Sequence, residues 1–321
     1  MKVLLIKMSS MGDIIHTLPA LTDAQMAVPD IQFDWVVEPA FADIAQWHPA
    51  VNKIIPINLR YYKKHPIEAF RKKFLPELYK NLNQTEYDFI IDPQGLLKSA
   101  IVGKMAKGLL CGYDKKSARE KIASYFYQQK YSVDKEQHAI LRIRELFSQI
   151  LNYSFDKNKI DYQINTEKLS TLNFLLPVQY IVFLHGTTWP TKHYPEKSWV
   201  KLLEKIHDKN TIVLLPWGNP VEKARAERLA GGFKHVTVLP KLSIAQMATV
   251  LKNAKAVVTV DTGLGHLSSA LKTKTIALYG PTYPKYVGML GDNQFDLCAE
   301  SQSAEVNIDP EKIWAVLEKL I

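Results

Sequence analysis

The sequence predicts an α/β protein built from two Rossmann-like domains, and three observations support this prediction. The chain has 321 residues, which is too long for one ordinary domain and suits two of about 150 residues each. Apolar, strand-like runs alternate with helical segments in both halves, as in parallel sheets. A polar segment over 152–179 separates the halves. We therefore expect domains over 1–170 and 171–309, followed by a terminal helix over 310–321.

The first half begins with Val3–Ile6, an apolar run typical of a buried parallel strand. By the same patterns, strands are expected over 2–7, 33–38, 54–57 and 87–92. Helices are expected over 17–28, 66–83, 97–107, 119–129 and 136–151.

The second half alternates more regularly and predicts a complete doubly wound unit. Strands are expected over 180–185, 211–215, 236–239, 256–260 and 274–279. Helices are expected over 196–208, 220–230, 244–253 and 264–271. Asn219-Pro220, Ser243 and Asp309-Pro310 are typical helix starts, because a side-chain oxygen can cap free backbone N–H groups and proline fits the first turn. The apolar face of the terminal helix must pack against another element.

The turn after the first strand, Ser9-Ser10-Met11-Gly12-Asp13, is the most informative segment of the chain. Ligands of open α/β sheets bind outside the carboxyl ends of the strands, so Asp13 would face the binding crevice. A simple helix cap is the alternative for such an aspartate. A nicotinamide-dependent oxidoreductase would carry G-x-G-x-x-G at this turn, and the chain does not.

A second turn, Asp261-Thr262-Gly263-Leu264-Gly265-His266, follows the predicted strand over 256–260. A helix that begins there would direct free N–H groups and its positive dipole end at an anion such as phosphate. The loop after the strand over 180–185 adds Thr187, Thr188 and Lys192, which suit a diphosphate. Lys192 could instead be a solvated loop lysine, and His266 a buried histidine bonded to a carbonyl.

The net charge of +9 is concentrated in one region. Between Lys53 and Lys130 there are 16 Lys/Arg and 7 Asp/Glu, whereas the charges of the remaining chain cancel. The densest stretch, 60–74, alternates basic residues with aromatic ones, which suits an anionic amphiphile or a membrane surface. A solvated helix face is one alternative, and a non-catalytic anion- or nucleic-acid-binding protein is another. No nucleic-acid recognition motif supports the latter.

Composition sets further expectations. Cys111 and Cys298 fit neither a disulfide framework nor a zinc spacing, and no D-x-D occurs, so we expect no bound metal. No run approaches the ~20 apolar residues that a membrane span needs, so we expect a cytoplasmic protein.

The pattern K-x-S-S-x-G-D-x-x-H-T-L-P-A-L over 7–21 resembles the N-terminal signature of the bacterial lipopolysaccharide heptosyltransferases. The resemblance covers nearly the whole chain. It continues through Asp92-Pro93-Gln94-Gly95-Leu96, His185-Gly186-Thr187-Thr188, Lys192-His193, Leu215-Pro216-Trp217-Gly218 and Val260-Asp261-Thr262-Gly263-Leu264-Gly265-His266-Leu267.

This resemblance implies the GT-B arrangement, in which two Rossmann-like domains face each other across a cleft and the last helix packs back on the first domain. It implies an inverting transfer of heptose from ADP-heptose to the inner Kdo sugar of lipid A, without metal or cofactor. We accordingly expect a monomer, peripheral on the cytoplasmic face of the inner membrane, with no nucleic-acid partner. A transferase that adds a later heptose is the alternative within the family, and the match over 9–13 favours the first transfer.

The resemblance also implies roles for individual residues. Asp13 would be the catalytic base, Glu222 would bind the ribose, and Asp261 would accept hydrogen bonds from heptose hydroxyls. Trp217, Leu239, Pro240 and Leu242 could form an apolar wall for the adenine. The implied donor site comprises Thr187, Thr188, Lys192, Glu222, Asp261, Thr262, Gly263 and His266. For the anionic acceptor we expect Ser10, Arg60, Lys63, Lys64, Lys72 and Lys73.

Overall fold

The computed structural model describes residues 1–187, 189–207, 209–299 and 306–321. The chain divides into two compact units, Met1–Thr166 and Glu167–Ile321, with a short 3-10 helix, η3 (Thr166–Lys168), at the division. This division falls close to the boundary expected at residue 170. Each unit is described by itself below.

The first unit contains a six-stranded sheet whose neighbouring strands all run parallel. Its strands are β1 (Lys2–Ile6), β2 (Gln32–Val37), β3 (Val51–Pro56), β4 (Tyr87–Asp92), β5 (Gly108–Tyr113) and β6 (Gln129–Tyr131). The spatial order is β3-β2-β1-β4-β5-β6, which is the Rossmann order, and the order reverses between β1 and β4. β1 is apolar because it is buried from Val3 to Ile6.

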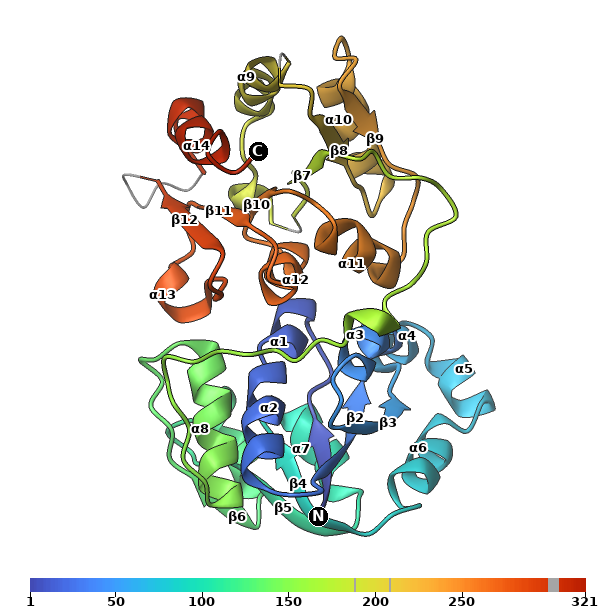
Figure 1. Ribbon diagram of the computed structural model, residues 1–321. Helices are drawn as coiled ribbons and strands as arrows, with labels where there is room; N and C mark the ends of the chain where they lie inside the picture. Colours follow the sequence, from blue (N-terminus) through green and yellow to red (C-terminus); the bar gives the residue numbers. More distant parts are fainter. Residues whose placement is uncertain (188, 208, 300–305) are drawn as a thin grey trace. The chain divides into compact units, whose positions relative to one another are not determined.

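Helices cover both faces of this sheet (Figure 1). They are α1 (Met11–Ile15), α2 (Leu18–Ala27), α3 (Ala42–Gln46), α4 (Leu59–Lys64), α5 (Pro66–Arg71), α6 (Phe74–Leu82), α7 (Leu97–Lys104) and α8 (Ala139–Leu151), with 3-10 helices η1 (Pro39–Phe41) and η2 (Lys121–Tyr125). α2 and α8 lie side by side, and the buried Arg144 of α8 donates from Nε to Asp23 of α2 at 2.6 Å.

Three predictions for this unit were wrong in detail. Strands β5 and β6 were not predicted, and the helix expected over 119–129 is only η2. β5 contains two glycines, which disfavour strands. At Gly112 a Cβ would lie 2.5 Å from the Tyr127 ring, so there is no room for a larger side chain at this position. The helix expected over 66–83 is broken between α5 and α6, where Lys73 adopts a left-handed conformation with φ of 50°.

The second unit repeats the architecture. Its parallel strands are β7 (Tyr180–Leu184), β8 (Ile212–Leu215), β9 (Val236–Val238), β10 (Val257–Val260), β11 (Thr275–Tyr279) and β12 (Gln294–Cys298). Their order, β12-β11-β10-β7-β8-β9, is again the Rossmann order, with its reversal between β7 and β10. β12 was not predicted, because its partly exposed sequence lacks the apolar run of a central strand. The fold class predicted from the sequence, two Rossmann-like α/β domains, is confirmed.

The helices of the second unit are α9 (Glu196–Ile206), α10 (Pro220–Ala230), α11 (Ile244–Lys252), α12 (Gly263–Ala270), α13 (Pro284–Val287) and α14 (Pro310–Leu317), with the 3-10 helix η4 (Pro190–Lys192). Helices α9, α10, α11 and α14 begin at the predicted residue, α12 begins one residue earlier, and α13 was not predicted. The side chains of Asn219, Ser243 and Asp309 accept backbone N–H groups at the starts of α10, α11 and α14. Each cap satisfies a donor that the helix leaves free.

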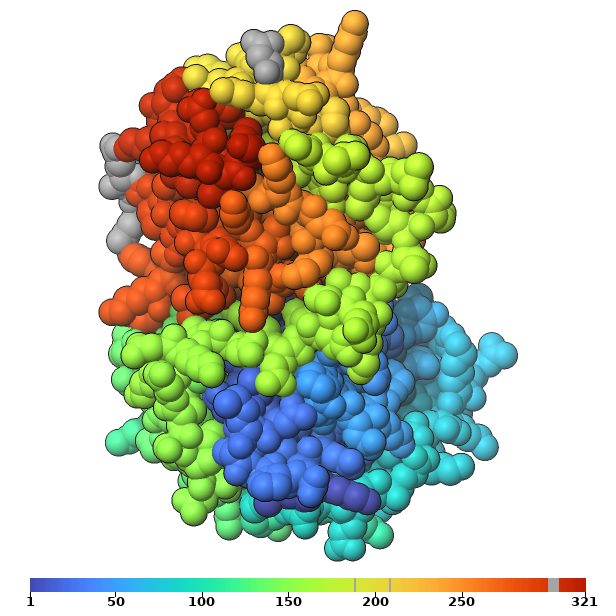
Figure 2. Space-filling model, viewed as in Figure 1, coloured from blue at the N-terminus to red at the C-terminus, as the bar shows by residue number. Residues whose placement is uncertain are grey.

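The terminal helix α14 corrects one expectation. It was expected to pack back on the first domain, but its buried residues Ile313 and Leu317 belong to the hydrophobic core of the second unit. Its neighbour is α9, and the red atoms of α14 lie beside the yellow atoms of α9 in the space-filling view (Figure 2). The helix has a single apolar face, and this face is buried in the core of the second unit.

Within the described ranges, the structure contains no helix that is both long and apolar enough to cross a membrane.

Candidate active site

The loop between β1 and α1 lies at the carboxyl end of the first sheet, where the strand order reverses. The turn Lys7–Ser10 ends β1, and α1 carries Asp13 in its first turn. A ligand is expected outside this edge of an open sheet. The short helix therefore holds the Asp13 carboxylate at the expected binding position of the first unit.

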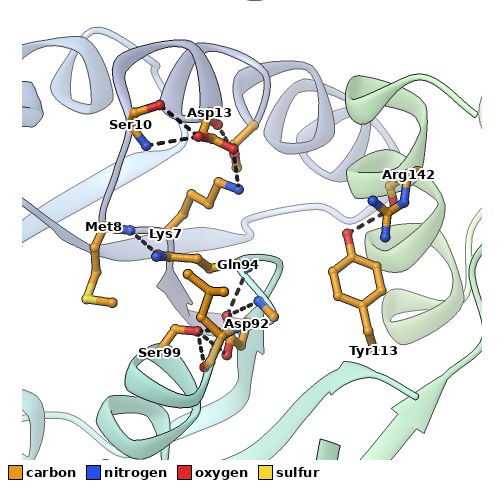
Figure 3. A network of polar contacts seen from close by, with 12 residues as sticks. Lys7, Met8, Ser10, Asp13, Asp92, Gln94, Ser99, Tyr113 and Arg142 are labelled. Atoms are coloured by element: carbon orange, nitrogen blue, oxygen red, sulfur yellow. Dashed lines mark hydrogen bonds and ion pairs between the residues drawn. The ribbon is translucent and has the colours of Figure 1, made fainter. Parts of the chain in front are cut away.

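Three donors hold the Asp13 carboxylate (Figure 3). Ser10 donates to Oδ2 from its backbone N–H at 3.0 Å and from its Oγ at 2.9 Å. The Nζ of the buried Lys7 lies 3.2 Å from Oδ1. Burial alone would raise the pKa of Asp13, but the Lys7 ammonium and the Ser10 donors hold this pKa well below its usual range. The side chain keeps 35% of its surface exposed, so the carboxylate remains accessible.

Asp92, at the end of the adjacent strand β4, has a different role. Its fully buried carboxylate accepts from the N–H groups of Gln94 (2.9 Å) and Gly95 (3.2 Å), from Ser99 Oγ (2.8 Å) and from the Tyr127 hydroxyl (2.7 Å). Burial raises the pKa of Asp92 to about 6, against the opposing effect of these donors. Asp92 therefore shapes the loop after β4 and is not exposed to a substrate.

The two loops of the first unit are joined by one hydrogen bond. The backbone N–H of Met8, after β1, donates to Oε1 of Gln94, after β4, at 2.8 Å (Figure 3). Because Gln94 belongs to the loop that Asp92 organises, the conformation of the β1 loop depends indirectly on the buried carboxylate. The segment Asp92–Leu96, one of the motifs that carry the resemblance, thus supports the residues around Asp13.

The basic stretch predicted for the acceptor occupies α4, α5 and the turn before α6. Arg60, Lys63, Lys64, Lys72 and Lys73 are all exposed. The structure brings some of them to a cavity of about 630 Å³, whose lining is Lys64, His65, Pro66, Ile67, Glu68, Arg71 and Lys72.

The cavity is less uniformly positive than the sequence indicated. Glu68 forms an ion pair with Lys72 at 2.6 Å, one helical turn apart, and accepts from the Tyr61 hydroxyl. Arg71 also lines the cavity but was not among the predicted acceptor residues. Lys63 and Lys73 are exposed without lining it.

In the second unit, the loops after β7 and β10 meet at an ion pair. The Lys192 ammonium, in η4, lies 2.5 Å from Oδ2 of Asp261, which follows β10. Nε2 of His266, in α12, lies 3.6 Å from Oδ1 of the same carboxylate. Burial alone would raise the pKa of Asp261, but His266 and Lys192 lower this pKa well below its usual range.

Thr262 and Gly263 form the start of α12 beside this ion pair. Thr262 is the N-cap residue with extended backbone, and its own side chain does not cap the helix. The first N–H groups of the eight-residue α12 are therefore directed at the carboxyl end of the sheet next to the Lys192 ammonium. This combination of N–H groups, helix dipole and cation suits a phosphate group.

Glu222 lies beside the loop after β7. Its Oε2 accepts the N–H of Gly218 at 2.7 Å, and its own N–H is capped by Asn219 at 3.0 Å. A Cβ on Gly186 would lie 2.8 Å from Cδ of Glu222, so the carboxylate packs directly over this glycine. Trp217, predicted as part of an adenine wall, donates from Nε1 to the Leu239 carbonyl at 2.7 Å, which links the loops after β8 and β9.

Thr187 lies next to Gly186 in the same loop and is partly buried. Thr188, the other predicted hydroxyl, lies outside the described residues. Among the described residues, no group of three or more His, Cys, Asp or Glu side chains is arranged to hold a metal ion.

Arg225 is a residue that the sequence reasoning missed. From α10, its guanidinium donates to the His185 carbonyl at 3.1 Å and contacts Nδ1 of His193, so it ties together both ends of the loop that carries Lys192. Burial and the neighbouring Arg225 lower the pKa of His193, which favours the neutral ring that can accept this hydrogen bond. The spacing from Glu222 places Arg225 on the same face of α10, but its contacts with residues about 30 to 40 positions earlier have no local signal in the sequence.

Comparisons with known proteins identify the family and relatives of this chain. A family described as glycosyltransferase family 9 (heptosyltransferase) matches residues 76–313. Lipopolysaccharide heptosyltransferase 1 of Escherichia coli (strain K12) is 47% identical over 328 aligned positions, which cover 100% of this chain and 99% of that protein. The protein of the same name from Pseudomonas aeruginosa is 48% identical, with coverage of 92% of this chain and 83% of that protein.

Two solved structures are similar over the full chain. The E. coli heptosyltransferase WaaC with ADP has a TM-score of 0.91 and 44% sequence identity, with 100% of both chains covered. The same enzyme with ADP-2-deoxy-2-fluoro heptose has a TM-score of 0.88 and 44% identity, with 99% of both chains covered.

The structural role of Asp92 can be tested by stability. Asp92→Ala leaves the Tyr127 hydroxyl, Ser99 Oγ and two backbone N–H groups without their acceptor. We expect the free energy of unfolding, measured in urea at pH 7.5, to fall by about 3 kcal/mol or more. The control Asp43→Ala removes an exposed carboxylate and should change it by no more than about 0.5 kcal/mol. Equal effects of the two substitutions would contradict this role.

Proposed function

The chain belongs to glycosyltransferase family 9, the heptosyltransferases, and we propose that it transfers heptose from ADP-heptose to the inner Kdo sugar of lipid A during synthesis of the lipopolysaccharide core. The observation that carries the proposal is the full-length similarity to enzymes named lipopolysaccharide heptosyltransferase 1. The solved complex of WaaC with an ADP-heptose analogue supports the donor. We do not favour a later heptose transfer, since the match to a heptosyltransferase 2 of E. coli is only 24% identical.

The donor diphosphate is assigned to the second unit. Lys192 and the first N–H groups of α12, from Gly263 onward, supply positive charge and hydrogen-bond donors at one place. Thr187 and Thr188 add hydroxyls from the loop after β7. Negative charge grows on the diphosphate as it leaves, so groups fixed here lower the barrier as well as bind the donor.

The nucleoside and sugar lie on opposite sides of this diphosphate in the proposal. Glu222 would accept hydrogen bonds from the ribose hydroxyls, because the Gly218 N–H holds its carboxylate over Gly186 in the loop after β7. Asp261 and His266 would contact the heptose side. The low pKa of Asp261 keeps it a carboxylate, which can accept hydrogen bonds from sugar hydroxyls but donates none.

Asp13 is the proposed base in a single displacement with inversion. The acceptor hydroxyl oxygen attacks the anomeric carbon, the bond from that carbon to the diphosphate oxygen breaks, and ADP leaves with the bonding electron pair. The hydroxyl proton passes to the Asp13 carboxylate. Proton transfer of this kind contributes about 10²–10⁴-fold to the rate.

The low pKa of Asp13 keeps it a carboxylate that can accept this proton. A carboxylate held by Lys7 and Ser10 is a weak base toward an ordinary hydroxyl. The hydroxyl becomes acidic only as its oxygen bonds to the anomeric carbon, so proton transfer follows bond formation. Because the folded-state pKa is depressed, Asp13 stays ionised at all pH values above about 4.

The role of Asp13 is tested with Asp13→Asn, which keeps the size of the side chain and removes the base. We expect kcat to fall by about 10²–10⁴-fold, with the Kd for ADP-heptose nearly unchanged in calorimetry. The control Asp43→Asn, on an exposed position of α3, should retain full activity. A variant at position 13 that keeps more than about a tenth of the wild-type kcat would exclude this role.

The acceptor is assigned to the basic stretch of α4 and α5. Lipid A and Kdo carry phosphates and carboxylates, which match the exposed cations around the 630 Å³ cavity. Ser10, whose N–H and Oγ already hold Asp13, would lie next to the reacting hydroxyl. Exposed Tyr61, Ile67 and Phe70 would contact the lipid surface. We propose a peripheral enzyme on the cytoplasmic face of the inner membrane.

This assignment is tested by neutralising Lys63, Lys64, Lys72 and Lys73 to Gln together. Each basic side chain near an anionic surface contributes about 1 kcal/mol, and Glu68 already offsets part of this at Lys72, so we expect the acceptor KM to rise by at least about tenfold. The donor KM should stay unchanged. The charge-matched control neutralises Lys197, Lys234, Lys274 and Lys319, all exposed in the second unit. Equal acceptor KM values for the two quadruple variants would contradict the assignment.

A further inference from the structure

A cavity of about 400 Å³ in the second unit shares Lys192 with the site described above, and its other lining residues have no role there. Small-molecule sites commonly have volumes of about 300–1,000 Å³. Its walls come from the loop before and within η4 and from the segment between β11 and the end of α13. The lining is Trp189, Thr191, Lys192, Pro281, Thr282, Tyr283, Tyr286 and Val287.

Aromatic side chains in this cavity are unusually open to solvent. Trp189 is 65% exposed and Tyr283 is 49% exposed. The Tyr283 and Tyr286 rings lie with centroids 6.4 Å apart at an interplanar angle of 73°, so they present two differently oriented faces. Aromatic rings left exposed beside a lysine and two threonines suit a ligand with both apolar and hydroxylated surfaces.

The position of the cavity follows from the strand order. Glu222 lies in the first turn of α10, the helix after β8, whereas Lys192 follows β7 and Asp261 follows β10. These three strands are successive neighbours in the sheet. The next strand is β11, and Pro281–Val287 follow it directly. Neighbouring strands lie about 4.8 Å apart, so each step along this order moves a ligand group by roughly that distance.

In a donor bound along this edge, the ribose, diphosphate and sugar follow one another in the same order as these strands. If Glu222 contacts the ribose and Lys192 contacts the diphosphate, the next group toward β11 is the one bonded to the far phosphate, which is the sugar. Lys192 itself lines the cavity and pairs with Asp261, so the cavity opens directly beside the proposed diphosphate position.

We infer that this cavity binds the heptosyl group of the donor, and that Trp189, Tyr283 and Tyr286 determine which sugar is accepted. The inference rests on the proposed function for its ligand. The rings contact the C–H faces of the sugar. Thr191 and Thr282, which line the cavity, bond its hydroxyls, together with Asp261, which pairs with the lining residue Lys192. An uncharged sugar also explains why apolar rings, and not further cations, follow the lysine.

The test compares two ligands that differ by the sugar. Trp189→Ala, Tyr283→Ala and Tyr286→Ala are each titrated with ADP and with ADP-heptose by calorimetry. Loss of one ring contact should weaken ADP-heptose about three- to tenfold, while the Kd for ADP changes by less than about twofold. The matched control is Tyr79→Ala on α6, a tyrosine that is 52% exposed in the first unit. It should bind both ligands like the wild type.

Several outcomes would overturn the inference. Equal weakening of ADP and ADP-heptose would place the rings at the nucleotide, and unchanged binding of both would make the cavity an unoccupied surface feature. A raised acceptor KM with unchanged ADP-heptose binding would assign the cavity to the acceptor. Tyr283→Leu is included because it removes the aromatic ring and keeps an apolar side chain. If one alanine variant does not fold, this variant and the remaining alanine variants still test the inference.

Failure of the proposed function would give a different result from failure of this inference. It would appear as wild-type protein that binds ADP-heptose without transferring heptose. The difference between the two ligands would still report on the cavity in that case.

Discussion

Each unit holds one carboxylate beside a lysine at the carboxyl end of its sheet, and the proposed chemistry depends on these two pairs. In the first unit Lys7 lies 3.2 Å from Asp13, and in the second Lys192 lies 2.5 Å from Asp261. Parallel strands place their carboxyl ends together, and the reversal of strand order opens the edge at this point. Both carboxylates have pKa values held below the usual range, so both remain acceptors of hydrogen bonds. In the proposed reaction, one of them accepts a proton and the other accepts hydrogen bonds from sugar hydroxyls.

Local signals in the sequence predicted the elements that surround these pairs. The apolar runs of β1, β7 and β10 and the caps at Asn219, Ser243 and Asp309 depend on neighbours in the sequence, and the structure contains them. Elements formed by distant pairing were missed, namely β5, β6 and β12, whose strands contain glycine or polar residues. The partner of α14 was also wrong, because an apolar face specifies burial without specifying its partner.

The same distinction applies to the site. Motifs predicted the segments that carry Asp13, Lys192 and Asp261, since strand-to-turn spacing determines where such residues lie. The supporting contacts required the three-dimensional structure. Arg225 reaches the loop after β7 from α10, and Glu68 neutralises part of the basic stretch from within it. Neither contact follows from a local pattern alone.

The central claim is tested most directly by ADP release from ADP-heptose in the presence of defined acceptors. The account predicts that purified protein releases ADP with lipid A bearing Kdo, and that no ADP is released with lipid A lacking Kdo. Mass spectrometry of the lipid product should show the addition of one heptose. ADP release that is independent of the acceptor, or transfer only to an acceptor that already carries heptose, would contradict the account.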